Sequence, residues 1–233
     1  METLAERLLK AREQRELNEY GRVLSDEERD KLIDEEDAKR EREARESRLS
    51  MNMSQFMASV PPRFKDATFE TYEYQTEKQL KVLDFLRLGK SAIIYGSNGT
   101  GKTHLAYASC KHQIAQGKTA GYTLAFDFFN KIRQSFGDGS TEQLVNRFIA
   151  YDYLVIDEID KTQGTPTEFN YLYHLINQRY NYMRSTVLIT NSKPDEFGAI
   201  MGQSVLDRVA SEGKVIDLTG DNYRQKRSKQ CTD

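Results

Sequence analysis

The chain has 233 residues, of which 30% are charged and 38% hydrophobic, and its formal net charge is -2. This length allows one globular domain with an extension, and the near-neutral charge excludes a global basic field, so any contact with DNA must come from a local patch. No apolar run approaches the roughly 20 residues that span a bilayer, and the scattered cysteines and histidines lack zinc-ligand spacing. The N-terminus, rich in acids, is not typical of a signal peptide. We therefore expect a cytoplasmic protein without a membrane or zinc partner.

Residues 1–50 differ in composition from the rest, because charged residues dominate them. Three leucines are spaced along one side of a short helix: Leu4, Leu8 and Leu9. A capping box between Ser25 and Glu28 predicts a second helix that runs toward Ser47. We interpret the segment as a helical, charged arm. It is either a solvated extension or a partner-binding arm with the leucines as contacts, and it is both if it orders on binding.

Residues 51–75 are interpreted as a connector in which Pro61-Pro62 stops any helix. In residues 76–233, apolar strands alternate with helices. We predict strands at about 91–95, 119–125, 153–157, 186–190 and 214–218, and helices at about 76–88, 102–116, 126–149 with a break at 137–139, 166–184, 194–200 and 203–210. This alternation predicts an α/β fold with a parallel five-stranded sheet and flanking helices, preceded by the small helical extension.

The first predicted strand runs directly into a glycine-rich loop. Its residues are Gly96, Ser97, Asn98, Gly99, Thr100, Gly101, Lys102 and Thr103, followed by His104. The loop fits G-x-x-x-x-G-K-[ST], in which backbone N–H groups and a helix N-terminus surround phosphate oxygens. Lys102 is expected to reach the β- and γ-phosphates, and Thr103 to hold Mg²⁺. A chance match in a glycine-rich turn is the alternative, but the strand–loop–helix context favours a nucleoside triphosphatase.

Polar side chains follow the third and fourth predicted strands. Asp157 and Glu158 end the third strand, where Asp157 would bind Mg²⁺ and Glu158 would orient and deprotonate the attacking water. Without the phosphate loop, surface acids would be the simpler interpretation, and Asp160 is predicted to be one. Asn191 follows the fourth strand, at the edge of a parallel sheet where ligands bind. We expect its amide near the γ-phosphate, although an asparagine in a turn is the alternative.

These motifs together resemble the AAA+ ATPases of the DnaC/IstB group and, within it, the DnaC-type replicative helicase loaders. The matching stretches are Pro61 to Phe64, Phe69 to Tyr72, Gly96 to Thr103, Leu154 to Ile159, Leu188 to Ser192, Leu206 to Val209, and Asp221 to Arg224. The resemblance implies a P-loop fold of the AAA+ type, without a separate lid domain, that binds ATP with Mg²⁺ and hydrolyses it. Oligomerisation or DNA would stimulate turnover. The implied catalytic residues are Lys102, Asp157, Glu158, Asn191 and Arg208.

Three arginines match the family by position. Arg208 takes the place of an arginine finger that acts on ATP held by the next subunit of a homo-oligomer, and a guanidinium suits that task because it stabilises charge on the transferred phosphoryl group. Arg224 takes the place of a second sensor arginine that touches ATP. Arg179 matches a recurring arginine to which no role is assigned. The family often has another arginine four residues before the finger, where this chain has Ser204.

Initiator-type members of this clade insert an extra helix after the second strand, and that helix contacts single-stranded DNA. The stretch 126–148 has room for it. The candidate contacts are Phe128, Phe129, Lys131, Arg133 and Phe136. Aromatic rings and cations together suit sequence-independent binding of a single strand. The alternative is that the phenylalanines pack the helix on the sheet and the cations are solvated.

We therefore expect an ATP-dependent loader that places a replicative, DnaB-type ring helicase onto single-stranded DNA when replication begins, of bacterial or phage origin. One alternative is an IstB-type transposition helper that binds duplex DNA. Another is a nucleotide-switched adaptor without a role on DNA. The charged arm and the Pro-Pro-Arg-Phe stretch favour the loader.

Overall fold

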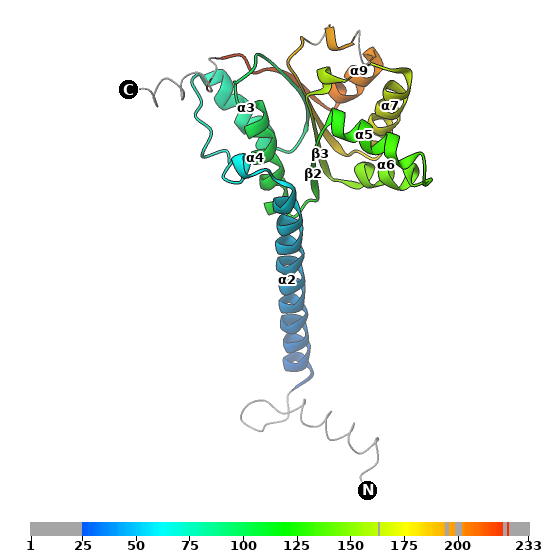
Figure 1. Ribbon diagram of the computed structural model, residues 1–233. Coiled ribbons are helices and arrows are strands. Elements are labelled where there is room, and N and C mark those ends of the chain that lie inside the picture. Colours follow the sequence, from blue (N-terminus) through cyan, green and yellow to red (C-terminus); the bar gives the residue numbers. More distant parts are fainter. Residues whose placement is uncertain (1–24, 163, 194–195, 199–201, 221–222, 224–233) are drawn as a thin grey trace. The chain divides into compact units, whose positions relative to one another are not determined.

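The computed structural model describes residues 25–162, 164–193, 196–198, 202–220 and 223 (Figure 1). The chain divides into two compact units, residues 1–50 and residues 51–233, and each is considered by itself. Among the described residues, no helix has both the length and the apolar character needed to cross a bilayer.

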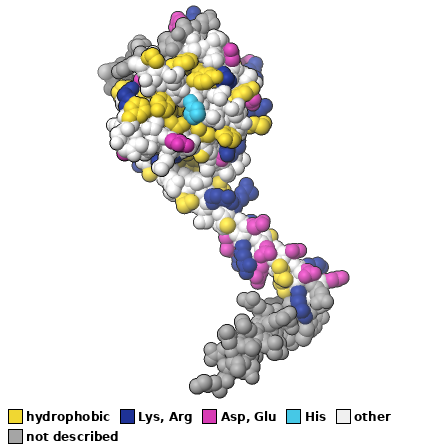
Figure 2. All heavy atoms as spheres, turned by 90° about the vertical axis from the view of Figure 1, so that its right-hand side faces the viewer, with side chains coloured by type: hydrophobic (Ala, Val, Ile, Leu, Met, Phe, Trp, Pro, Cys, Tyr) yellow, Lys and Arg dark blue, Asp and Glu magenta, His cyan; other side chains and the backbone are white. Residues whose placement is uncertain are grey.

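Helix α2 spans Asp26–Ser59, and its first part belongs to the smaller unit. It begins with the predicted capping box, in which the Glu28 N–H donates to Ser25 Oγ at 3.3 Å and the Ser25 N–H donates to Glu28 Oε2 at 2.9 Å. Nearly all side chains from residue 27 to residue 50 are exposed. Figure 2 shows positive and negative side chains interspersed along this helix. A helix that is polar on every side has no core of its own to stabilise it.

The prediction that this helix ends near Ser47 is wrong, because α2 continues to Ser59. No glycine or proline interrupts it. Its last turns have an apolar side, on which Phe56 is buried and Met53 and Met57 pack against the same core. The first part of the predicted connector is therefore helical and packed. The two prolines end the helix as predicted, and a 3₁₀ helix η1, Pro62–Phe64, follows.

The larger unit is built on five parallel strands in the order β2-β3-β4-β1-β5. They are β1 Ser91–Tyr95, β2 Ala120–Leu124, β3 Tyr153–Asp157, β4 Ser185–Thr190 and β5 Gly213–Asp217. Ile94 of β1 lies opposite Ile189 of β4 on one side and Ile216 of β5 on the other. The central strands β3, β4 and β1 are buried except at one end residue each of β4 and β1, as expected for a parallel sheet covered on both faces.

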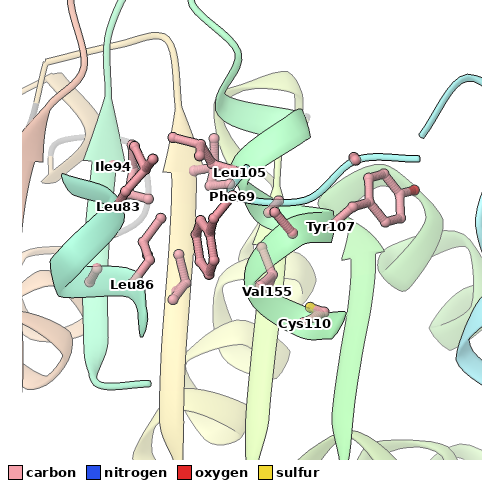
Figure 3. Packing of buried hydrophobic residues seen from close by; sticks show 14 of the residues in the cluster. Phe69, Leu83, Leu86, Ile94, Leu105, Tyr107, Cys110 and Val155 are labelled. Atoms are coloured by element: carbon pink, nitrogen blue, oxygen red, sulfur yellow. The ribbon is translucent and has the colours of Figure 1, made fainter. Parts of the chain in front are cut away.

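Helices cover both faces of the sheet (Figure 1). They are α3 Glu77–Arg87 and α4 Lys102–Ala115 on one face, and α5 Ala125–Ser135, α6 Thr141–Ala150, α7 Pro166–Asn181 and α9 Gln203–Ser211 on the other; a short 3₁₀ helix η2, Ile159–Lys161, follows β3. One core lies between α3, α4 and the sheet and includes Leu86, Leu105 and Val155 (Figure 3). A second core lies beneath the other four helices. The predicted α/β fold is confirmed.

The break predicted between residues 137 and 139 separates α5 from α6, and Gly139 has a φ of 73° there. Thr76 caps α3 as predicted, because its side chain accepts a hydrogen bond from the Gln79 N–H. The helix predicted at 194–200 falls largely on residues that lie outside the described part of the chain.

Candidate nucleotide-binding site

The loop between β1 and α4 requires glycine. Gly96 and Gly101 have φ angles of 151° and 89°, which side chains rarely adopt. A Cβ on Gly96 would lie 2.4 Å from the Leu218 carbonyl oxygen, and one on Gly101 would lie 2.5 Å from the Tyr72 ring. The backbone is therefore held tightly in front of α4, whose first N–H groups have no partner within the helix.

A cavity of about 410 Å³ opens in front of this loop, within the size range of small-molecule sites. Three groups of residues line it: the loop residues 98–104, the polar residues that follow β3 and β4, and a segment between residues 63 and 79. Topology brings the first two groups together, because the carboxyl ends of parallel strands meet at one edge of the sheet. Tyr223 also lines the cavity, and its N–H donates to the Gly99 carbonyl at 3.0 Å.

Lys102 lies under the loop. Its Nζ donates to the carbonyl oxygens of Gly96 and Ser97, each at 2.8 Å, and the side chain is 8% exposed. Gly96 and Ser97 therefore hold the lysine, whereas the predicted ligands from Asn98 to His104 face the cavity. The Lys102 ammonium therefore lies beside the loop that is expected to bind phosphate oxygens.

His104 connects the start of α4 to the segment before α3. Its Nε2 lies 2.9 Å from the Thr68 carbonyl oxygen and 3.3 Å from Thr71 Oγ1. Burial lowers the pKa of His104, although the bond to Thr68 opposes that shift. Nearby, the Tyr72 hydroxyl donates to the Thr100 carbonyl at 2.8 Å. Tyr72, which is not part of the glycine loop, thus holds that loop through a hydrogen bond. The sequence motif alone does not predict this contact.

Asp157 is the buried acid of the site, with 2% of its surface exposed. Its Oδ2 accepts hydrogen bonds from Thr103 Oγ1 at 2.8 Å and from the Tyr122 hydroxyl at 3.0 Å, and its Oδ1 accepts one from the Glu158 N–H at 2.7 Å. Burial raises the pKa of Asp157, while the three hydrogen bonds oppose that rise. A desolvated carboxylate beside a hydroxyl is an oxygen donor pair of the kind that Mg²⁺ prefers.

Glu158 and Asn191 also line the cavity. Glu158 is exposed and has a left-handed backbone, with a φ of 53°, which is uncommon for a residue other than glycine. The prediction that Asp160 is a surface acid is wrong. It is half-buried, and its carboxylate accepts hydrogen bonds from the Asn191 N–H at 3.1 Å and from Asn191 Nδ2 at 3.3 Å. Asp160 therefore orients the side-chain amide of Asn191, which is predicted from the sequence to lie near the γ-phosphate.

Arg208 lies away from this cavity. Its Nε donates to Asn177 Oδ1 at 2.9 Å, its Nη1 donates to the Ser204 carbonyl at 2.9 Å, and its guanidinium stacks 5.0 Å from the Tyr173 ring. It lines a smaller cavity of about 210 Å³ near the amino ends of β1 and β4. The fold of one chain does not bring Arg208 to the phosphate loop, and Ser204 contributes only its backbone.

Arg179 has a structural role. It is fully buried, and its guanidinium donates to the carbonyl oxygens of Phe148, Ile149, Tyr151 and Ser185 and to Thr186 Oγ1. Desolvation lowers the pKa of Arg179 to about 9. The side chain thus binds carbonyl oxygens at and just after the end of α6 and at the start of β4.

The aromatic residues of the predicted DNA-binding stretch divide between core and surface. Phe128 and Phe129 are buried in the second core, so the prediction that they stack on DNA is wrong. The reason is that α5 is amphipathic and its apolar side faces the sheet. Phe136 is 51% exposed, with its ring 5.9 Å from that of Tyr171.

The two predicted cations of this stretch also differ. Lys131 is exposed. Arg133 Nη1 lies 3.0 Å from Glu168 Oε1, and that carboxylate belongs to a side chain that is only 4% exposed. Arg133 therefore has a partner within the fold. The remaining predicted contacts, Arg224 and the three leucines at positions 4, 8 and 9, lie outside the described residues.

Comparison with known proteins agrees with this geometry. Residues 2–231 match the family described as IstB-like ATP binding protein. The replicative helicase loader DnaC of Escherichia coli strain K12 is 30% identical over 201 residues, which cover 80% of each chain. The insertion sequence IS5376 putative ATP-binding protein of Geobacillus stearothermophilus is 28% identical over 170 residues, which cover 67% of each chain. A crystal structure of the DnaC helicase loader superposes with a TM-score of 0.62 at 20% identity, covering 67% of this chain and 99% of that one, and this likeness concerns the fold.

Proposed function

Because the chain belongs to the family of IstB-like ATP binding proteins, we propose that it is an ATPase that loads a replicative, DnaB-type ring helicase onto single-stranded DNA. One observation carries the ATPase part of the proposal: the glycine loop, Lys102 and the Thr103–Asp157 pair all meet at a single cavity. Those three features correspond to the parts that grip phosphate and metal in P-loop ATPases.

ATP fits the site by its phosphates. The loop N–H groups and the N-terminus of α4 supply fixed positive dipoles, and Lys102 can exchange its bonds with two loop carbonyls for phosphate oxygens. Thr103 and Asp157 would hold Mg²⁺, whose hard charge suits their oxygens and offsets the cost of a buried carboxylate. When bound, Mg²⁺ neutralises charge that develops on the phosphates.

Hydrolysis also needs a group that activates water. Glu158 is the candidate base, because it is exposed to the cavity and directly follows the metal-binding acid. Asn191, oriented by Asp160, would polarise the same water or contact the γ-phosphate. Both residues directly follow strands of the sheet, which places them at the same edge of the cavity.

Arg208 would act in trans. Its separation from the phosphate loop within one chain is what a finger acting on a neighbouring subunit requires. We therefore include a homo-oligomer, formed on ATP binding, in which Arg208 of one copy faces the cavity of the next. Turnover would then depend on assembly.

The two relatives bear on the choice between two candidate functions. The match to the helicase loader covers more of the chain than the match to the insertion-sequence protein, at 80% against 67%, and the charged helix before the folded core offers a surface for a protein partner. These observations favour the loader. The second candidate is a transposition helper that binds duplex DNA, and the similarity to an insertion-sequence protein supports it.

ATP turnover measured alone, with single-stranded DNA, with duplex DNA and with a DnaB-type helicase tests the proposal. A loader should respond to single strands and to its helicase. A helper should respond to duplex DNA. Negligible turnover under all conditions, with tight ATP binding, would indicate an adaptor instead.

A further inference from the structure

The carboxylate of Asp157 is held by a residue that belongs to no nucleotide-binding motif. Tyr122 lies in β2, opposite Val155 of β3. Residues two apart in a strand point to the same side of the sheet, so Val155 and Asp157 share a face. The Tyr122 side chain reaches along that face, and its hydroxyl donates to Asp157 Oδ2 at 3.0 Å.

The Tyr122 ring is fixed by its neighbours. It is half-buried, and its centroid lies 4.2 Å from that of Tyr107. Tyr107, which projects from α4 in Figure 3, is itself stacked on Phe64 at 5.0 Å and lies 6.3 Å from Phe56. The Tyr122 ring therefore packs at the end of a row of rings that continues through Tyr107 to Phe64 and Phe56. A hydroxyl on a packed ring is suited to fix the plane of a carboxylate, whose own terminal torsion is broad.

Thr103 and Tyr122 share Asp157 Oδ2 but have different tasks. In the proposed function Thr103 would also hold Mg²⁺ through its hydroxyl oxygen, while the hydroxyl proton is donated to the carboxylate. Tyr122 has no metal to hold, and its hydroxyl interacts with the carboxylate and with the Tyr107 side chain. Groups that orient a metal ligand in this way change metal affinity when they are removed.

We propose that Tyr122 is a positioning residue that orients Asp157 for Mg²⁺ and so sets the dependence of ATP binding on Mg²⁺. The proposal rests on the proposed function, because it assumes that Asp157 holds the metal. The competing explanation is that Tyr122 only fills the core beside Tyr107 and that its hydroxyl bonds to the nearest acceptor.

The test is the affinity of the full chain for a fluorescent ATP analogue, titrated with and without Mg²⁺. In Tyr122→Phe the ring and its packing remain and only the hydroxyl is lost. We expect unchanged affinity without Mg²⁺, and a rise of about tenfold in the Mg²⁺ concentration needed for half-maximal binding.

Tyr153→Phe is the matched control. Tyr153 is buried in the same core cluster at the opposite end of the strand that carries Asp157, so the substitution removes a hydroxyl without touching the carboxylate. It should keep the Mg²⁺ dependence of the parent chain. Thermal unfolding of both variants shows whether either loses its fold.

Three results would overturn the proposal: a normal Mg²⁺ dependence in Tyr122→Phe, an equal loss of affinity with and without Mg²⁺, or loss of the folded state. Each would make Tyr122 a packing residue. A parent chain whose nucleotide affinity ignores Mg²⁺ would instead contradict the proposed metal site, so the two failures are distinguishable.

Discussion

Lys102 and Glu158 face the same cavity from different elements, and their loss should have different effects. Lys102→Ala removes the cation that grips phosphate, so ATP affinity and turnover should both fall. Glu158→Gln keeps the shape and removes only the base, so binding should persist while turnover falls about 100-fold or more. Direct nucleotide binding and phosphate release measure the two effects.

Glu73→Gln is the matched control, because Glu73 lines the same cavity from the segment before α3. It should turn over normally. If Glu158→Gln hydrolysed ATP like the parent chain, another group would have to activate the water.

Arg208→Ala should leave ATP binding to a single chain intact and remove turnover in the assembly, since the guanidinium stabilises the transition state about 10³-fold or more in related chemistry. Mixing Arg208→Ala with Lys102→Ala chains restores interfaces that pair an intact loop with an intact Arg208. Phosphate release should therefore partly recover. No recovery at any ratio, with mixed assembly verified, would argue against action in trans.

Some residues of the site could be predicted from the sequence, and others could not. Lys102 was predictable from the fixed spacing of the glycine loop, and Asp157 and Glu158 were predictable because they end an apolar strand in a chain that has this loop. Tyr122 and Asp160 were not, because a strand tyrosine and a lone acid have no local pattern, and their tasks exist only once the fold brings them to Asp157 and Asn191. Tertiary contacts of this kind leave no periodic signal in the chain.

At the scale of elements, α5 carries the predicted contact with single-stranded DNA. Lys131→Ala should weaken DNA binding and reduce the slope of log affinity against log salt by about 0.7, because one phosphate contact is lost. Arg133→Ala is a poorer test, because it leaves the buried Glu168 carboxylate without its partner. DNA binding across a salt series provides the measurement.

Lys81→Ala is the control for that change. Lys81 is an exposed lysine on α3, so the substitution alters net charge equally at another place. A slope that changes as much in Lys81→Ala as in Lys131→Ala would mean that DNA responds to overall charge, and an unchanged slope in Lys131→Ala would put the DNA site elsewhere.

The elements themselves were largely predictable, and the exceptions have physical reasons. Strands β1, β3 and β4 follow from apolar runs that alternate with helices, and all five strands lie close to their predicted positions. The end of α2 was missed because charged residues dominate most of the helix and hide its last apolar positions, Met53, Phe56 and Met57, whose partners lie far away in the chain. Likewise, the sequence around Phe128 and Phe129 is compatible with both DNA binding and core packing. Their burial in the structure shows that they belong to the core.

At the scale of the molecule, we expect the arm to capture the helicase and the larger unit to handle nucleotide. A chain that begins at Met51 keeps Phe56 in the core, so it should fold and bind ATP yet fail to bind helicase. A chain that begins at Ser59 loses Phe56, a loss that costs about 3–5 kcal/mol of stability for a core phenylalanine.

In the full chain, Leu4→Asp with Leu8→Asp should abolish capture without shortening the protein. Co-elution with the helicase measures the effect. Full affinity in the chain that begins at Met51 would mean that the arm is a solvated extension.

The loading reaction itself tests the central claim most directly. The measurement is the amount of DnaB-type ring helicase that becomes bound to a closed single-stranded DNA circle, with the parent chain and ATP, with Lys102→Ala, and with duplex circles as competitor. We predict loading by the parent chain on single strands, little by Lys102→Ala, and no loss to duplex circles. If the parent chain left the helicase in solution, or the helicase loaded equally well without it, the protein would not be a helicase loader.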